Sequence, residues 1–235
     1  SLRFARSASA PLSPDIHKKF EKRFNIPIIE TMGLTETGSQ ITTNPMPPGE
    51  RKIGSPGKAY GNQIMIGDDH FEARPAGEMG EILVKGDNVM QGYFKQPEET
   101  HKTILGNGWL RTGDLGYLDT DGYVFVSGRI KELIIKGGEN IAPREIDEAL
   151  LTHPSILEAA AFAVPCQDYG ERVEACVRLK EKVSVDLVEL KSHCENQIGK
   201  FKSPDNIHIV ADLPKGPSGK VQRLKLLELI YENQN

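Results

Sequence analysis

Thr35 and Glu36 place a hydroxyl and a carboxylate side by side in a short polar segment, ETMGLTETG. Oxygen ligands of this kind are the ones that Mg²⁺ prefers beside a triphosphate. A Thr-Glu pair also occurs at the start of helices, where side chains cap free backbone N–H groups. The pair therefore indicates either a contact to metal and phosphate or a helix cap.

Asp114 ends the segment RTGD, which follows Trp109. We predict that Gly113 allows a tight turn there and leaves the aspartate projecting. The two carboxylate oxygens could then accept hydrogen bonds from both hydroxyls of a ribose. An aspartate in an ordinary polar turn is the alternative interpretation.

Two basic segments follow. In GRIKELIIKGGENI, residues 128–141, Arg129 comes before a short apolar strand that runs into the paired glycines Gly137 and Gly138. Arginine can hold two oxygens at once, and glycine lets a backbone approach a ligand closely. In PKGPSGKVQR, Lys220 follows a glycine but lacks the spacing of a Walker loop. Taken alone, these segments indicate a basic hairpin and a solvated surface lysine.

Together the four segments, in this order and at these separations, resemble the later signature motifs of the adenylate-forming enzymes. That family includes acyl-CoA synthetases, firefly-type luciferases and the adenylation domains of peptide synthetases. The resemblance runs from about Leu2 to about Leu227 and is closest to the ligases of the 4-coumarate, oxalate and medium-chain fatty acid group. The phosphate loop that such enzymes carry upstream is absent, so we expect the C-terminal part of a larger synthetase whose N-terminal part is missing.

The resemblance implies a nucleotide and acyl site in the first half of the chain. The adenine contacts would come from Ser9, Ala10 and Pro11, with Glu30, Thr31 and Met32 beside the base. Thr35 would contact the α-phosphate, Glu36 would bind Mg²⁺, and Asp114 and Arg129 would contact ribose or phosphate. The acyl pocket would include Gly33, Leu34 and Gly38.

In the second half, the resemblance implies that Lys220 brings a positive charge to the α-phosphate of ATP. Lys131 would be the hinge about which a mobile domain swings. Coenzyme A would pass along Gly137, Gly138 and Asn140, where glycine backbone leaves room for a thin pantetheine chain.

The implied activity is that of an acid–thiol ligase. A carboxylic acid and ATP would give an acyl-adenylate and pyrophosphate, and CoA would then displace AMP. Two alternatives stay open: an adenylation domain that loads a carrier protein, and a non-catalytic module that binds nucleotide or CoA. We expect the 235 residues by themselves to be inactive.

Three blocks of elements must position these residues, in a mixed α/β and α+β fold. Residues 1–44 indicate an α/β remnant: a short strand, a helix after Ser13-Pro14 with Ile16, Phe20 and Phe24 on one face, and a buried strand over 25–30. Residues 45–129 hold short strands near 63–66, 81–85 and 123–126 and a helix near 97–105, which suggests a small β-barrel-like subdomain. By the resemblance, 1–129 is part of the AMP-binding domain.

Residues 130–235 indicate a compact α+β domain, which the resemblance implies to be mobile. Helices are expected from 143, 184 and 221, and strands over 159–164, 173–179 and 207–210.

The composition excludes several classes of function. A net charge of −4 argues against an extended nucleic-acid-binding face. The three cysteines form no CxxC pair and suit a reducing, cytoplasmic compartment. The six histidines lack the spacing of metal ligands, and no apolar run reaches membrane-spanning length.

Overall fold

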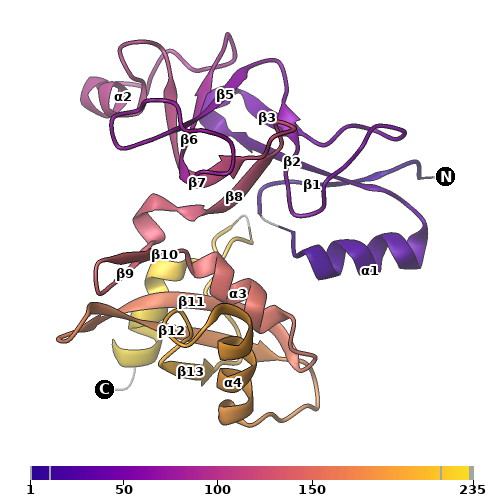
Figure 1. Cartoon of the computed structure of the whole chain (residues 1–235), viewed down its shortest axis with the longest axis vertical. Helices are drawn as coiled ribbons and strands as arrows, with labels where there is room; N and C mark the ends of the chain where they lie inside the picture. The colour runs from indigo at the N-terminus through magenta and orange to yellow at the C-terminus, as the bar shows by residue number, and fades with distance from the viewer. Residues whose placement is uncertain (1, 11, 218, 233–235) are drawn as a thin grey trace. The chain divides into compact units, whose positions relative to one another are not determined.

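The computed structural model describes residues 2–10, 12–217 and 219–232. It divides into two compact units, Ser1–Ile130 and Lys131–Asn235, whose elements are labelled in Figure 1. Pro11, one of the predicted adenine contacts, lies outside the described residues. Among the described residues, no helix is both long and apolar enough to cross a membrane.

The first sheet of unit 1 has the order β1-β2-β3-β4. Its strands are β1 (Ala5–Ser7), β2 (Ile28–Leu34), β3 (Ser39–Thr43) and β4 (Lys58–Ala59), with helix α1 (Pro14–Phe24) between β1 and β2. β1 and β2 are parallel and β2 and β3 antiparallel. The buried strand predicted over 25–30 is displaced toward the C-terminus, because pairing with β3 extends β2 through residues 31–34.

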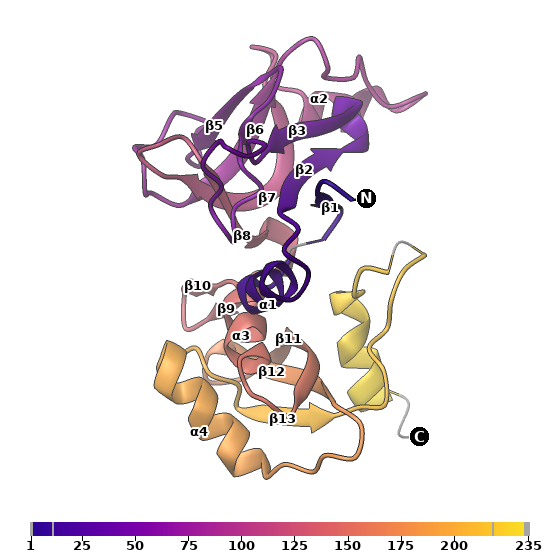
Figure 2. The ribbon, with the colours of Figure 1, turned by 90° about the vertical axis from the view of Figure 1, so that its right-hand side faces the viewer.

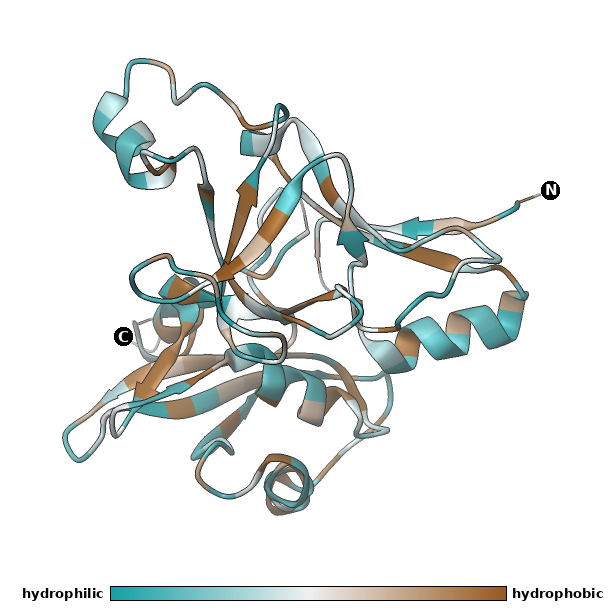
Figure 3. Ribbon diagram, turned by 45° about the horizontal axis from the view of Figure 1, so that its top comes forward, coloured by the Kyte–Doolittle hydropathy of each residue, from teal (hydrophilic) through white to brown (hydrophobic). Residues whose placement is uncertain are grey.

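Helix α1 begins at its proline, as the sequence predicts, but its apolar stripe is not buried within unit 1. Ile16 and Phe24 are exposed, whereas His17 is 1% exposed. The His17 Nδ1 lies 2.8 Å from Glu30 Oε1, and its Nε2 lies 3.1 Å from Glu21 Oε1. A polar contact, not the apolar periodicity, therefore fixes this helix against β2. Figure 3 shows α1 mainly in the hydrophilic colour, while the strands hold most of the apolar residues.

The second sheet of unit 1 is an antiparallel meander, β5-β6-β7-β8. Its strands are β5 (Gln63–Gly67), β6 (Gly80–Lys85), β7 (Leu110–Leu118) and β8 (Val124–Arg129), and helix α2 (Pro97–Thr103) precedes β7. Among the described residues β5 and β8 are the end strands and do not pair, so the barrel-like closure that we predicted is not found. Ile66, Ile82 and Val124 form its core.

Unit 2 is built on a five-stranded sheet, with β9 (Ile134–Lys136), β10 (Glu139–Ile141), β11 (Ile156–Cys166), β12 (Gly170–Leu179) and β13 (Asn206–Ile209). Helices α3 (Pro143–Leu151) and α4 (Leu187–Ile198) cover one face, where residues such as Leu150 and Leu190 are fully buried. The C-terminal segment covers the other face through Leu226 and Ile230 (Figure 2).

The last predicted helix, over 221–231, is instead a 3₁₀ turn, Arg223–Lys225, followed by a π-helical turn, Glu228–Glu232. A polar network anchors it to the sheet. The fully buried Glu174 accepts hydrogen bonds from Tyr231 at 2.7 Å and from Asn206 at 2.9 Å, and its Oε2 lies 2.7 Å from His208 Nε2. These contacts lower the pKa of Glu174 although its burial opposes the shift.

Candidate functional site

Glu36 lies in a short 3₁₀ helix, Thr35–Thr37, directly after β2. Its Oε1 accepts a hydrogen bond from the Tyr93 hydroxyl at 2.9 Å, and its carbonyl accepts one from the Met90 amide at 2.8 Å. Burial and the contact with Glu36 raise the pKa of the Tyr93 hydroxyl, so Tyr93 remains a donor at neutral pH. Tyr93 therefore orients this carboxylate, and no sequence signal pointed to it.

Thr35 is exposed, and the turn is held by its neighbour Thr37. The Thr37 hydroxyl donates to the Leu34 carbonyl at 3.0 Å and accepts from the Leu34 amide at 3.4 Å. The helix-cap interpretation thus applies to Thr37. The hydroxyl of Thr35, next to Glu36 in the chain, is at the surface and takes no part in this cap.

Asp114 and Arg129 are register partners on the adjacent strands β7 and β8. Arg129 Nε lies 2.7 Å from Asp114 Oδ1, with the aspartate side chain 10% and the arginine side chain 42% exposed. The RTGD segment is a strand with an irregular register, not the tight turn that we predicted. Gly113 has a φ of +70° at this irregularity, and its amide donates to Glu81 Oε1 at 3.0 Å. Glu81 was not identified from the sequence.

The predicted base contacts have different surroundings. Ser9 and Ala10 are exposed, and Ser9 has a φ of +72°. The carboxylate of Glu30 is buried against His17. Met32 is partly buried and packs against the core of the second sheet, and its contact with the base stays a prediction.

Gly33 is required by the contact of two backbones. A Cβ built at Gly33 would lie 1.9 Å from the carbonyl oxygen of Ser39, its near neighbour on β3. The carbonyl of Ser39 thus occupies the place that a side chain at residue 33 would take, and the position of Gly33 in the acyl pocket stays a prediction. Leu34 is partly buried and Gly38 is exposed beside it, with a φ of +64° at the end of the 3₁₀ helix.

In unit 2, Lys220 is exposed on a tight loop. Lys215 and Val221 pair across its base, and the Gly216 amide donates to the Lys220 carbonyl at 2.8 Å. Lys131 is exposed in a 3₁₀ turn, Ile130–Glu132.

The predicted CoA contacts lie together on the hairpin of β9 and β10. Gly137 and Gly138 form its turn with φ values of +59° and +84°, and Asn140 follows on β10. All three are exposed. Because both turn residues are glycines, no side chain covers the backbone there, and a thin ligand could lie along this edge of unit 2.

Arg223 joins the Lys220 loop to the body of unit 2. Its Nη2 donates to Asp147 Oδ2 at 2.7 Å, its Nε donates to Glu132 Oε2 at 3.3 Å, and its Nη1 donates to the Ala161 carbonyl. The Arg223 side chain is 14% exposed, and these neighbouring carboxylates raise the pKa of its guanidinium against the effect of burial. Arg223 is a further residue that sequence analysis missed.

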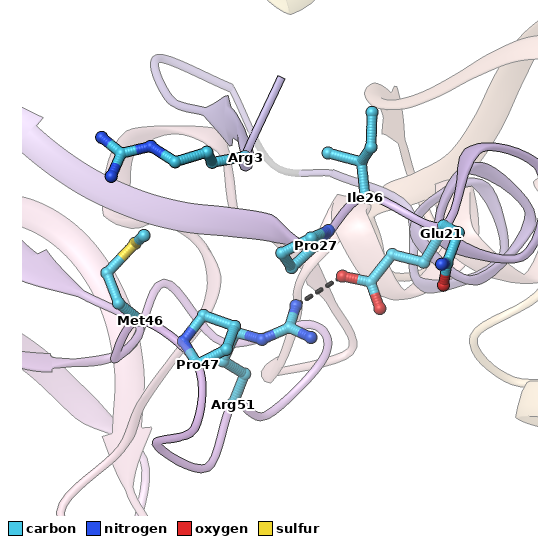
Figure 4. A pocket seen from close by; sticks show the side chains of 8 residues that line it. Arg3, Glu21, Ile26, Pro27, Met46, Pro47 and Arg51 are labelled. Carbon is cyan, nitrogen blue, oxygen red and sulfur yellow. Dashed lines mark hydrogen bonds and ion pairs between the residues drawn. The ribbon is translucent and has the colours of Figure 1, made fainter. Parts of the chain in front are cut away.

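A pocket of about 600 Å³ lies elsewhere in unit 1, beside the C-terminal end of α1. Figure 4 shows the ion pair of Glu21 and Arg51 among the residues that line it, with Pro27 and Met46 nearby. Burial raises the pKa of Glu21, but the hydrogen bonds from Arg51, the Ile28 amide and His17 outweigh it, and the pKa lies at about 2. None of the predicted site residues lines this pocket.

Within the described residues, no cluster of three or more His, Cys, Asp or Glu side chains could hold a metal ion. Glu36 supplies one carboxylate. Mg²⁺ is commonly bound by one or two carboxylates together with phosphate oxygens of the substrate. The donor chemistry at Glu36 therefore fits Mg²⁺ bound jointly with a nucleotide.

Comparison with protein families finds matches on both sides of the unit boundary. Residues 1–94 match the model "AMP-binding enzyme", and residues 145–220 match "AMP-binding enzyme C-terminal domain".

Curated relatives match nearly the whole chain. Sulfoacetate–CoA ligase of Cupriavidus necator is 53% identical over 96% of this chain and 44% of its own length. Oxalate–CoA ligase of Saccharomyces cerevisiae is 40% identical over 97% of this chain and 42% of its own length. The chain thus spans less than half the length of these relatives.

Solved structures share the fold. The ATP-bound MatB of Rhodopseudomonas palustris has a TM-score of 0.92 and 37% identity, covering 97% of this chain and 45% of that one. The o-succinylbenzoate CoA synthetase of Bacillus subtilis, in complex with its acyl-adenylate intermediate, has a TM-score of 0.85 and 34% identity, covering 96% and 46%.

Proposed function

The chain belongs to the family of AMP-binding enzymes, and on that premise we propose that it is the C-terminal part of an acid–CoA ligase. The observation that supports this most strongly is the match to curated CoA ligases across 94–97% of the chain, on both sides of the unit boundary. A carboxylic acid and ATP give an acyl-adenylate and pyrophosphate, and CoA then displaces AMP to give an acyl-CoA. The first step is needed because a carboxylate is a poor acylating agent, whereas AMP is a good leaving group.

Unit 1 would hold the nucleotide. Asp114 accepts hydrogen bonds from the ribose hydroxyls, and Arg129, which pairs with Asp114, contacts ribose or phosphate. The backbone at Ser9 and Ala10, and at Glu30 and Thr31, lies along the base. Glu36, oriented by Tyr93, would hold Mg²⁺, which would neutralise phosphate charge, and the Thr35 hydroxyl would contact the α-phosphate.

Lys220 would act on the first half-reaction. Attack of the carboxylate on the α-phosphate brings two anions together, and a lysine ammonium offsets that charge. Two unit charges about 4 Å apart interact by roughly 4 kcal/mol at an effective dielectric of about 20, against about 1 kcal/mol in water. This difference favours delivery of the lysine into a site that excludes solvent, which a swing of unit 2 about Lys131 would provide.

The hairpin at Gly137 and Gly138 would serve the second half-reaction by admitting the pantetheine chain of CoA. Because the chain spans less than half the length of its relatives, we propose that the complete protein is longer and that the 235 residues alone do not turn over.

The test uses the complete protein that contains this sequence, with ATP, a panel of short carboxylic acids, and either CoA or a carrier protein. We expect pyrophosphate release with one or more acids and AMP release that requires CoA. Transfer to a carrier protein without transfer to CoA would refute the ligase assignment in favour of a carrier-loading domain. Turnover by the isolated 235 residues would refute their proposed inactivity.

A further inference from the structure

Arg6 stretches from β1 across the first sheet of unit 1. Its Nε donates to the hydroxyl of Thr31 on β2 at 3.2 Å, and its Nη2 donates to Oε1 of Gln40 on β3 at 2.6 Å. Two separate strands therefore fix the plane of the guanidinium, although the residue lies at the surface of unit 1.

Both acceptors of Arg6 are uncharged. Arg51, Arg111 and Arg129 each pair with a carboxylate, whereas in the described part of the chain no carboxylate lies within ion-pair distance of Arg6. A guanidinium has five N–H donors, and the two bonds described use one at Nε and one at Nη2. Arg6 thus presents an uncompensated positive charge with donors still available in a fixed orientation.

The place of this charge is informative. Gln40 is the register partner of Gly33, and Thr31 precedes Gly33 by two residues on the same strand. Side chains two residues apart on a strand share a face, so Arg6 lies over the face of the sheet at which Gly33 and its neighbours were predicted to bind the acyl group. An arginine held by neutral partners there is suited to bind a carboxylate or sulfonate through two parallel hydrogen bonds.

We infer that Arg6 selects acids that carry a second anionic group, a carboxylate or sulfonate, in addition to the carboxylate that is activated. The inference rests on the proposed ligase function and deepens it by naming the substrate class. A neutral acyl tail would leave the remaining guanidinium donors without an anionic acceptor, which disfavours monocarboxylic acids with apolar chains.

The experiment measures kcat/KM of the complete protein with ATP and CoA for two matched pairs of acids. Sulfoacetate is compared with methylsulfonylacetate, and malonate with its monomethyl ester, because each pair differs mainly in the charge of the second group. We expect a preference of at least about 10-fold for the dianion in one or both pairs, the range that a hydrogen bond to a charged group provides.

Arg6→Met should lower kcat/KM for the preferred dianion by roughly 10- to 100-fold, chiefly through KM, and leave its neutral counterpart within about threefold. Arg6→Lys should retain part of the preference, since it keeps the charge but not the bidentate geometry. Gln40→Leu, which removes one of the two orienting acceptors, should weaken the selectivity while the charge remains. Arg3→Met removes the same charge from the same segment and is the control without effect.

Loss of activity in Arg6→Met by the same factor on both members of a pair, together with a lower melting temperature, would assign Arg6 a structural role and overturn the inference. Equal use of charged and neutral acids by the unaltered enzyme would also overturn it, with the ligase function intact. Absence of CoA-dependent AMP release with every acid would instead refute the proposed function itself.

Discussion

Asp114 and Arg129 are fifteen residues apart in sequence but are register partners on adjacent strands, with Arg129 Nε 2.7 Å from Asp114 Oδ1. The aspartate side chain is 10% exposed and the arginine side chain 42% exposed, so the guanidinium is the more accessible member of the pair at the surface of unit 1.

Asp114→Asn should weaken nucleotide binding in the complete protein. The substitution keeps the size of the side chain and one acceptor for Arg129, but it removes the charge that strengthens hydrogen bonds to ribose hydroxyls. Because bonds to charged groups contribute about 1.5–3 kcal/mol, we expect a rise of roughly 10- to 100-fold in KM for ATP. Asp69→Asn, at an exposed position, is the control, and an unaltered KM for ATP in Asp114→Asn would contradict the ribose contact.

Lys220→Ala should separate the two half-reactions. The rate of adenylate formation, measured by pyrophosphate exchange, should fall by about 10²- to 10³-fold, which is the typical effect of losing one group that stabilises developing charge. Conversion of a supplied acyl-adenylate to the thioester should continue, since the hairpin at Gly137 and Gly138 is unchanged. Lys225→Ala, another exposed lysine after the same loop, should affect neither step. Equal loss in both half-reactions would rule out the role given to Lys220.

The ion pair of Glu21 with Arg51 should stabilise the protein at neutral pH and lose its effect in acid. Its pKa is lowered from 4.5 to about 2 in the folded state, so its ion pair with Arg51 contributes stability fully above pH 4.5. This contribution is lost as the pH falls from 4.5 toward about 2, and discounted for exposure to solvent it amounts to about 1–2 kcal/mol.

Urea unfolding of the protein and of Glu21→Gln, measured from pH 6 down to about pH 2, tests this linkage. The difference in free energy of unfolding between the two should shrink as the pH falls. If the difference in free energy of unfolding stays constant with pH, folding does not lower the pKa of Glu21.

Gly33→Ala should destabilise unit 1. The added methyl would meet the Ser39 carbonyl at 1.9 Å, and because that atom is backbone, the strands must separate. We expect a loss of at least about 1–3 kcal/mol, measured as a lower melting temperature. Gly106→Ala is the matched control, because a Cβ at Gly106 has nothing within 4 Å. Equal melting temperatures for the two variants would disprove the close approach of β2 and Ser39.

Arg223→Met should lower the stability of unit 2 more than the double substitution of Asp147→Leu with Arg223→Met does. Removing the arginine alone leaves the carboxylate of Asp147 buried without its partner, at a cost of about 3–5 kcal/mol, whereas replacing both groups with apolar side chains restores much of that loss. Melting temperatures give the order of stability. If the double variant were the less stable one, the pair would not be the reason for the loss.

The sequence determined much of the local structure. Helices α1, α2 and α3 begin at Pro14, Pro97 and Pro143, because proline fits the first turn of a helix and blocks its extension backward. The hairpin at Gly137 and Gly138 was likewise predictable from its paired glycines. The family was identifiable too, since its motifs are short runs of adjacent residues.

The tertiary structure decided which groups meet. That Asp114 pairs with Arg129, Glu36 with Tyr93 and Arg6 with Gln40 depends on strand register, and register irregularities at β2–β3, β6–β7 and β7–β8 shift it by whole residues. The closeness of Ser39 to Gly33 depends on the same shifts. Periodicity along a chain gives the face of a strand, but pairing between distant strands follows from the balance of packing and hydrogen bonds over the whole unit, so only the folded chain fixes these contacts.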